Sequence, residues 1–213
     1  MSVASTVTPG SADPATADPA VVESETVRPL RVAVELAGHS GPDYWADLTL
    51  GRAGDPPLDL SADASNVVRV RAADLREAGK LRDRIRAEAA GEGRDPDSVT
   101  VLVDVEVVLA SDARTARTAR TRRTRPESTR GEAGTLSYVG TPHGLAGLIA
   151  DIHAVQVADG VTLIPLAAPF TVEHLVDGTL PWLESRGLIE VSPTVVEVLR
   201  RFGEGAQASV RAS

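Results

Sequence analysis

The chain has 213 residues, of which 42% are hydrophobic, and a formal net charge of −8 at pH 7. This length suffices for one sizeable core, and the negative charge argues against nucleic acids and anionic membranes as partners, because like charges repel. The absence of cysteine excludes disulfides, thiolate catalysis and cysteine metal ligands, and it suits the reducing cytoplasm.

The chain divides into one predicted domain with a tail at each end. Residues 1–28 are rich in Ser, Thr, Ala and Pro without a hydrophobic period, so we predict a disordered tail that cannot repay the entropy of ordering. Residues 29–203 are predicted to form the domain, and residues 204–213 a second disordered tail. No run approaches the roughly 20 apolar residues that cross a bilayer. The first residues do not show the basic start and apolar stretch that are typical of a signal peptide.

Strand and helix patterns alternate between residues 30 and 110. Strands are predicted over 30–37, 66–70 and 99–110, a helix around 44–52 and a long helix over 73–90. The long helix is indicated by apolar residues at three- and four-residue intervals, namely Leu75, Ala78, Leu81, Ile85 and Ala89. Such alternation predicts βαβ units and a parallel α/β sheet.

A basic insertion interrupts this pattern at about residues 111–133. Residues 111–130 contain seven arginines and two acidic residues, which gives the segment a charge of about +5. It is either an arm that contacts nucleic acid or an acidic partner, or a solvated loop or frayed helix between core elements. The lack of interleaved aromatic residues favours the second interpretation.

The pattern of ordered elements returns after the insertion. Thr141 and Pro142 predict a helix start, with the threonine as N-cap and the proline in the first position. That helix is expected to reach about Val157, and a strand is expected from Val161 to Leu166. A further amphipathic segment over 172–183 is interrupted near 178–181, and residues 199–202 predict one more helical turn.

The strands share an apolar face and a charged face. In residues 99–107 the odd-numbered valines fall on one side, which places Asp104 and Glu106 on the other. The same period sets Arg31 with Glu35, and Arg69 with Arg71. Since helices must cover the apolar faces, the charged faces are expected to be wetted or to form cross-strand ion pairs. The strands over 30–37 and 161–167 are expected to be the sheet edges.

The histidines do not predict a metal site. His39, His143, His153 and His174 show no ligand spacing such as two histidines four residues apart on one helix. We expect His153 and His174 to be exposed, and His143 to lie in the first turn of its helix. No Ser-His-Asp or Walker-type arrangement is present, so catalytic residues stay unassigned.

Three segments carry a resemblance to a known family. The phrase VGTPHGLAGLI, with ADGVTLIPLAAPFTVEHLVDGTLPWLESRGL after it, resembles the carboxyl end of the luciferase-like flavin-dependent monooxygenases, in the branch that oxidises nitrilotriacetate and organosulfur compounds. AAGEGRDPDSVTVLVDVEVVLA is similar to that family's penultimate helix-to-strand passage, and ELAGHSGPDY to the turn after its fifth strand. The resemblance covers roughly residues 29–188.

The resemblance implies the second half of a TIM-type (β/α)₈ barrel, with about four parallel strands and covering helices. A complete barrel typically has ~250 residues, so the missing half is expected to come from a second copy or from a separately encoded partner. The implied activity is that of an FMN-dependent monooxygenase acting on a small organic substrate. The alternative is a catalytically inactive relative that serves as a binding or assembly module.

The implied flavin site is a glycine-containing turn after the first strand. In the family this turn holds the flavin phosphate, and it matches Gly38, His39, Ser40 and Gly41 here. Glycines let backbone amides approach an anion, and serine donates a hydrogen bond. His39 and Glu35 depart from the family's pattern, and Glu35 would place a negative charge near the phosphate.

Overall fold

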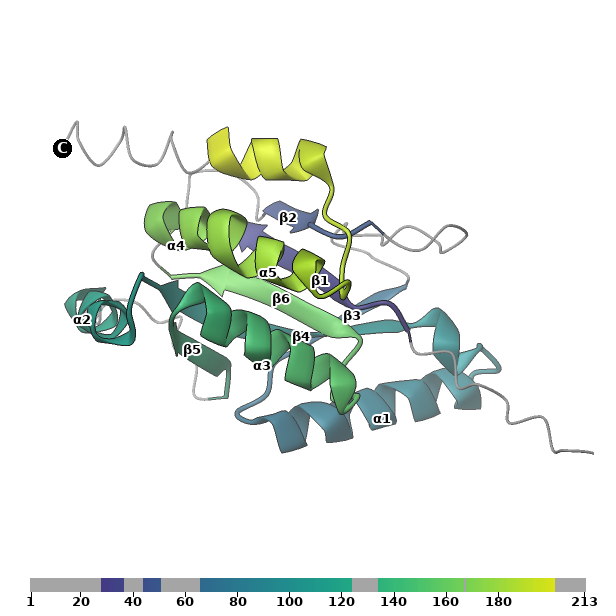
Figure 1. Cartoon of the computed structure of the whole chain (residues 1–213). Helices are drawn as coiled ribbons and strands as arrows, with labels where there is room; N and C mark the ends of the chain where they lie inside the picture. Colours follow the sequence, from purple (N-terminus) through teal and green to yellow (C-terminus); the bar gives the residue numbers. More distant parts are fainter. Residues whose placement is uncertain (1–27, 37–43, 51–65, 124–133, 167, 202–213) are drawn as a thin grey trace, which may run out of the picture.

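The computed structural model describes residues 28–36, 44–50, 66–123, 134–166 and 168–201. Nearly all of both expected tails, and the whole turn from Gly38 to Gly41, lie outside the described residues. Figure 1 shows the described part as a sheet with helices against one of its faces.

A six-stranded sheet forms the centre of the fold, and every pairing in it is parallel except the one between β1 and β2. Its path runs β2-β1-β6-β4-β3, and β5 also pairs with β4. β3 lies along the first half of β4 and β5 along the second half. The strands are β1 (Arg31–Leu36), β2 (Tyr44–Asp47), β3 (Val67–Val70), β4 (Thr100–Leu109), β5 (Leu136–Gly140) and β6 (Gly160–Pro165).

Two expectations about the sheet are wrong. Neither of the strands expected at the edges, 30–37 and 161–167, is an edge. β1 pairs with β2 on one side and β6 on the other, and β6 pairs with β1 and β4. The helix expected around 44–52 is instead strand β2 at its start, pairing antiparallel with β1. The aromatic residues Tyr44 and Trp45 suit a strand. The pairing with β2 also satisfies backbone groups of β1, and local propensity cannot reveal such a pairing.

The neighbours of β1 show where the barrel is incomplete. In a closed (β/α)₈ barrel the first and last strands lie side by side, and here β1 pairs with β6, the last described strand. The gap in the sheet therefore falls between β2 and β3, which are the two ends of the path. The resemblance to a continuous second half of a barrel implied missing strands before β1, and this strand order corrects it.

The helices begin at recognisable caps. The long helix predicted over 73–90 is confirmed as α1, where the Asp74 side chain accepts from the Glu77 amide at 2.8 Å and the Glu77 side chain accepts from the Ala73 amide at 2.8 Å. Thr141 caps α3 as predicted and accepts from the Gly144 amide at 3.2 Å. The helices are α1 (Leu75–Gly91), α2 (Ala113–Arg123), α3 (Pro142–Ala154), α4 (Ala168–His174), α5 (Leu180–Ser185) and a last helix over 193–201.

The segment predicted to be interrupted near 178–181 is continuous. A π-helical turn, Leu175–Thr179, joins α4 to α5. Gly178 lies so close to Pro142 that an added Cβ would stand 2.6 Å from the proline Cβ. Among the described helices, none is long and apolar enough to span a membrane.

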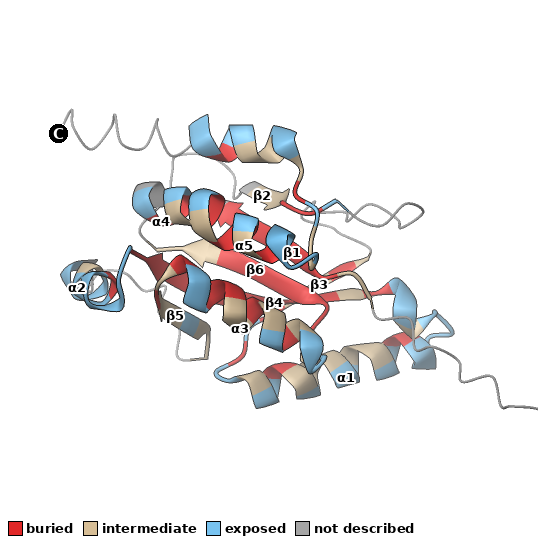
Figure 2. Ribbon diagram, viewed as in Figure 1, coloured by how far each residue is buried: buried red, intermediate tan, exposed pale blue. Residues whose placement is uncertain are grey.

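The main core lies between the sheet and the helices. β4 contributes its odd-numbered valines, and α3 contributes Leu145, Ile149 and Ile152, all of them fully buried. Figure 2 shows β6 between α3 and α5, with most of the strand buried. Each fully buried side chain of this size contributes ~1.5–3 kcal/mol.

The first half of the basic insertion is a packed helix. α2 follows β4 and precedes β5, and its Ala116 is fully buried. The remaining residues, 124–133, lie outside the described part.

Candidate functional site

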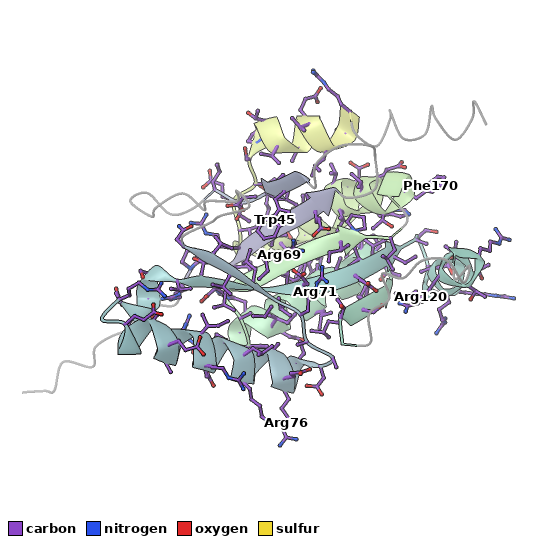
Figure 3. The ribbon with its side chains drawn as sticks, turned by 180° about the vertical axis from the view of Figure 1, so that it is seen from behind. Trp45, Arg69, Arg71, Arg76, Arg120 and Phe170 are labelled. Atoms are coloured by element: carbon purple, nitrogen blue, oxygen red, sulfur yellow. The ribbon has the colours of Figure 1, made fainter. Side chains whose placement is uncertain are left out.

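The sheet face opposite the helices carries the charged residues, as the alternation predicted. Figure 3 views this charged face, with Trp45, Arg69 and Arg71 near its middle. Register places Ala33, Thr162 and Asp104 side by side across three strands, and Glu106 beside Ser137. The buried polar residues of the charged face are Arg31, Glu35, Asp104, Glu106 and Thr162.

Arg69 is the centre of the charged face. Its Nε and Nη2 donate to Asp104 at 2.8 and 2.9 Å, and its Nη2 also donates to Glu35 at 2.5 Å. The guanidinium lies over the ring of Trp45, 4.0 Å from the centroid. Arg71 Nε adds a longer bond of 3.3 Å to Asp104. Of the two expectations for this face, cross-strand ion pairs are the one that the structure contains.

The contact between Arg69 and Glu35 requires a strongly curved sheet. β4 and β6 separate their strands, and three strand spacings of ~4.8 Å would place the backbones ~14 Å apart in a flat sheet. The curvature also buries a small apolar cluster on the charged face, formed by Ala33, Val67 and Leu102 with Trp45 against them. The side chains of this face therefore fill the inside of the curve.

Burial perturbs the acids of this face. It raises the pKa of Asp104, although hydrogen bonds from Arg69 and Arg71 oppose the rise. It also raises the pKa of Glu106, opposed by the charges of Arg120 and Arg71.

The carboxyl ends of β1, β4, β5 and β6 meet at one edge of the sheet, because these strands are parallel. In barrels this edge carries the active site. Here Arg120 of α2 donates to the Ser137 hydroxyl, Phe170 at the start of α4 is 64% exposed, and His143 is exposed in the first turn of α3. β1 also ends at this edge, at Leu36, and Gly38 to Gly41, which come next in the sequence, lie outside the described residues.

The structure does not bring the described histidines together. His143 and His153 lie at opposite ends of α3. His153 is half-buried, with Nε2 2.7 Å from the Arg28 carbonyl oxygen, and His174 is half-buried at the end of α4. The expectation that His153 and His174 are simply exposed is therefore wrong, since both are half-buried.

The opposite edge of the sheet holds a depression of about 160 Å³, lined in part by Arg28, Asn66 and Asp159. Asp159 is buried and accepts hydrogen bonds from the Val101 amide at 2.8 Å, from Arg86 at 2.6 Å and from Arg28 at 3.3 Å. This cluster joins α1 to the starts of β4 and β6. Because it lies at the amino ends of the strands, we assign it to stability.

Two residues of these clusters, Trp45 and Asp159, were not predicted from the sequence to take part in a site. Trp45 was placed in a helix, although the alternation of Trp45 and Asp47 with Ala46 is a strand signal. Asp159 was missed because a single acidic residue before a strand has no distinctive pattern.

Together, the parallel strands, the covering helices and the charged inner face define a partial (β/α)₈ barrel. The sequence matches no protein-family model and none of the curated proteins. Among solved structures, the chain is similar to DmoA from Hyphomicrobium sulfonivorans, with a TM-score of 0.50 and 15% identity over 59% of this chain and 39% of that one. At this identity the likeness shows the fold alone.

Two further solved structures are similar. The riboflavin lyase RcaE, solved with modified FMN and riboflavin, gives a TM-score of 0.49 and 19% identity over 63% of this chain and 42% of that one. The EDTA monooxygenase EmoA from Chelativorans sp. BNC1 gives 0.49 and 17%, over 59% and 41%. The chain thus spans about 40% of the length of each. The partial barrel expected from the sequence agrees with part of the fold of DmoA.

Proposed function

We propose that the chain is part of an FMN-dependent oxidoreductase of the luciferase-like type, acting on a small organic substrate in the cytoplasm. The observation that carries the proposal is the common edge at which β1, β4, β5 and β6 end. The sequence resemblance assigns the flavin phosphate to Gly38 to Gly41, which come directly after β1 in the sequence.

The surroundings of Glu35 remove one objection to this assignment. A free carboxylate at the end of β1 would repel a phosphate in the following turn. Arg69 donates to Glu35 at 2.5 Å, so the charge is compensated inside the sheet. The amides and the hydroxyl from Gly38 to Gly41 would hold the phosphate, and the absence of a G-x-G-x-x-G motif favours a mononucleotide over a dinucleotide.

We further propose that a second copy, or a separately encoded partner, completes the flavin pocket. The chain spans only about 40% of the length of the solved structures that it resembles, and a closed barrel typically needs ~250 residues. Sedimentation of the purified chain tests this proposal: a clean monomer without a copurifying partner contradicts it.

Titration with FMN tests the cofactor assignment. We expect saturable quenching of flavin fluorescence by FMN, and weaker binding of riboflavin, which lacks the phosphate. Ser40→Asp should weaken FMN binding more than riboflavin binding, because it adds a negative charge to the phosphate turn. Ser98→Asp, an exposed position at the amino ends of the strands, is the matched control and should change neither.

A second candidate function follows from the short span of the chain. A protein that covers about 40% of an enzyme's length can be retained as an inactive binding or assembly module. Absence of any saturable flavin signal, together with a stable complex with another protein, would favour this function.

A further inference from the structure

Within the described residues, the two ends of the sheet contact each other through side chains. β2 and β3 are the ends of the strand path, and the described strands place no backbone pairing between them. Nevertheless, Arg69 of β3 lies 4.0 Å from the ring centroid of Trp45 in β2. This contact crosses the gap that further strands occupy in a complete barrel.

The guanidinium of Arg69 sits in a cage of three groups from three strands. Trp45 offers its ring face from β2, Glu35 a carboxylate from β1, and Asp104 a carboxylate from β4. An aromatic face and two carboxylates are the groups that favour a planar cation. Arg69 belongs to β3 and contacts side chains of β1, β2 and β4. Of the other strands in the path, only the central β6 lacks a contact of this kind with it.

Burial separates this cage from an ordinary surface ion pair. The side chains of Arg69, Glu35 and Asp104 are 19%, 9% and 2% exposed. Exposed pairs contribute little because water screens them, whereas removing one partner of a buried pair leaves an uncompensated charge. Glu35 thus pairs with Arg69, and Asp104 pairs with Arg69 at 2.8 Å and with Arg71 at a longer 3.3 Å.

We propose that Arg69 is a latch that closes the inside of this partial barrel. It ties β3 to β1 and β2 across the gap between the described strands, so this part of the charged face is covered within the chain itself. Strands from another protein can enter this gap only after Arg69 leaves the cage. The cage and the residues assigned to the flavin phosphate share no residue, but Arg69 also compensates the charge of Glu35, so the test is made without flavin.

The two tryptophans of the chain provide the measurement. In a Trp182→Phe background the fluorescence reports on Trp45 alone. Adding Arg69→Met keeps an unbranched apolar stem but removes the charge and its hydrogen bonds. We expect acrylamide to quench Trp45 more strongly, and the thermal midpoint to fall by on the order of 10 °C.

A matched control exists on the outside of the molecule. Arg186 lies over Trp182, 5.0 Å from the ring centroid, and is exposed. In a Trp45→Phe background, Arg186→Met should leave the thermal midpoint almost unchanged. Equal, small effects of Arg69→Met and Arg186→Met would overturn the proposal.

Chemical rescue keeps the test decisive if the substituted protein folds poorly. Arg69→Ala empties the cage, and added guanidinium, far below the concentrations that unfold proteins, should restore both folding and the protection of Trp45. Sodium chloride at equal ionic strength controls for screening. Rescue by guanidinium that does not exceed the effect of sodium chloride would contradict a cation-specific cage.

Discussion

Gly160 of β6 packs directly against the backbone of Arg31 in β1, and a side chain at position 160 would overlap the Arg31 carbonyl. The two residues are partners in the parallel register that joins the first strand to the last described one. We expect Gly160→Ala to lower the free energy of unfolding by about 1–3 kcal/mol, because the strands must separate to admit the methyl group. Urea denaturation measures this loss.

Gly147 in α3 is the control for this substitution. No atom lies within 4 Å of a Cβ added there, so Gly147→Ala should raise stability by up to ~1 kcal/mol through helix propensity. Similar effects of the two substitutions would show that the β1–β6 contact is not tight.

Asp159 should be among the most sensitive polar positions outside the charged face. Its buried carboxylate accepts from Val101, Arg86 and Arg28, and Asp159→Ala is expected to cost about 3–5 kcal/mol in unfolding free energy, since it leaves arginines uncompensated. Asp83→Ala removes a carboxylate that is 67% exposed and pairs with Arg82. Denaturation of that control should reveal a loss below ~1 kcal/mol.

Glu106 should make stability fall as the pH rises. Because its pKa in the folded chain is raised above the ordinary 4.5, the folded state holds this proton more tightly than the unfolded state. The stabilisation is fully present below the ordinary pKa and is lost as the pH rises through the raised pKa. Glu106→Gln stays neutral, so its stability relative to the unsubstituted protein should increase across this window in urea unfolding at a series of pH values.

Asp112 provides a control of opposite sign. Hydrogen bonds from Thr115 lower the pKa of Asp112 below its ordinary 3.8. Its contribution is therefore present above the ordinary pKa and is lost as the pH falls through the lowered pKa. Asp112→Asn should be less stable than the unsubstituted protein at neutral pH, and this difference should vanish in acid. The same pH trend for both substitutions would refute the assignment.

The helix α2 should behave as a packed part of the domain. Ala116 is fully buried where α2 packs on β5 and β4, so Ala116→Leu is expected to destabilise the protein by about 1–3 kcal/mol through overpacking. Ala113 is exposed in the same helix, and Ala113→Leu should stay within ~0.5 kcal/mol. Thermal unfolding of the two variants compares them, and equal midpoints would mean that α2 is not anchored.

The elements that the sequence predicted well are those with a strong local period. α1 repeats its apolar residues over several turns between Asp74 and Gly91, and β4 alternates valines with acids, so neither needed its tertiary neighbours to be identified. β2 was not predicted because a strand of four residues is too short to show a clear alternation. It gains its stability by pairing with β1. The candidate flavin turn from Gly38 to Gly41 stays a prediction.

The sequence by itself determined that Glu35, Arg69 and Asp104 share one face, because the direction of a side chain in a strand is a local property with a period of two. Only the tertiary structure decided that β6 lies at the centre and β1 beside it, since strand order depends on contacts between residues more than 100 positions apart. It also decided that Arg69 reaches Glu35 across two intervening strands. That contact depends on the curvature of the whole sheet, which no single segment encodes.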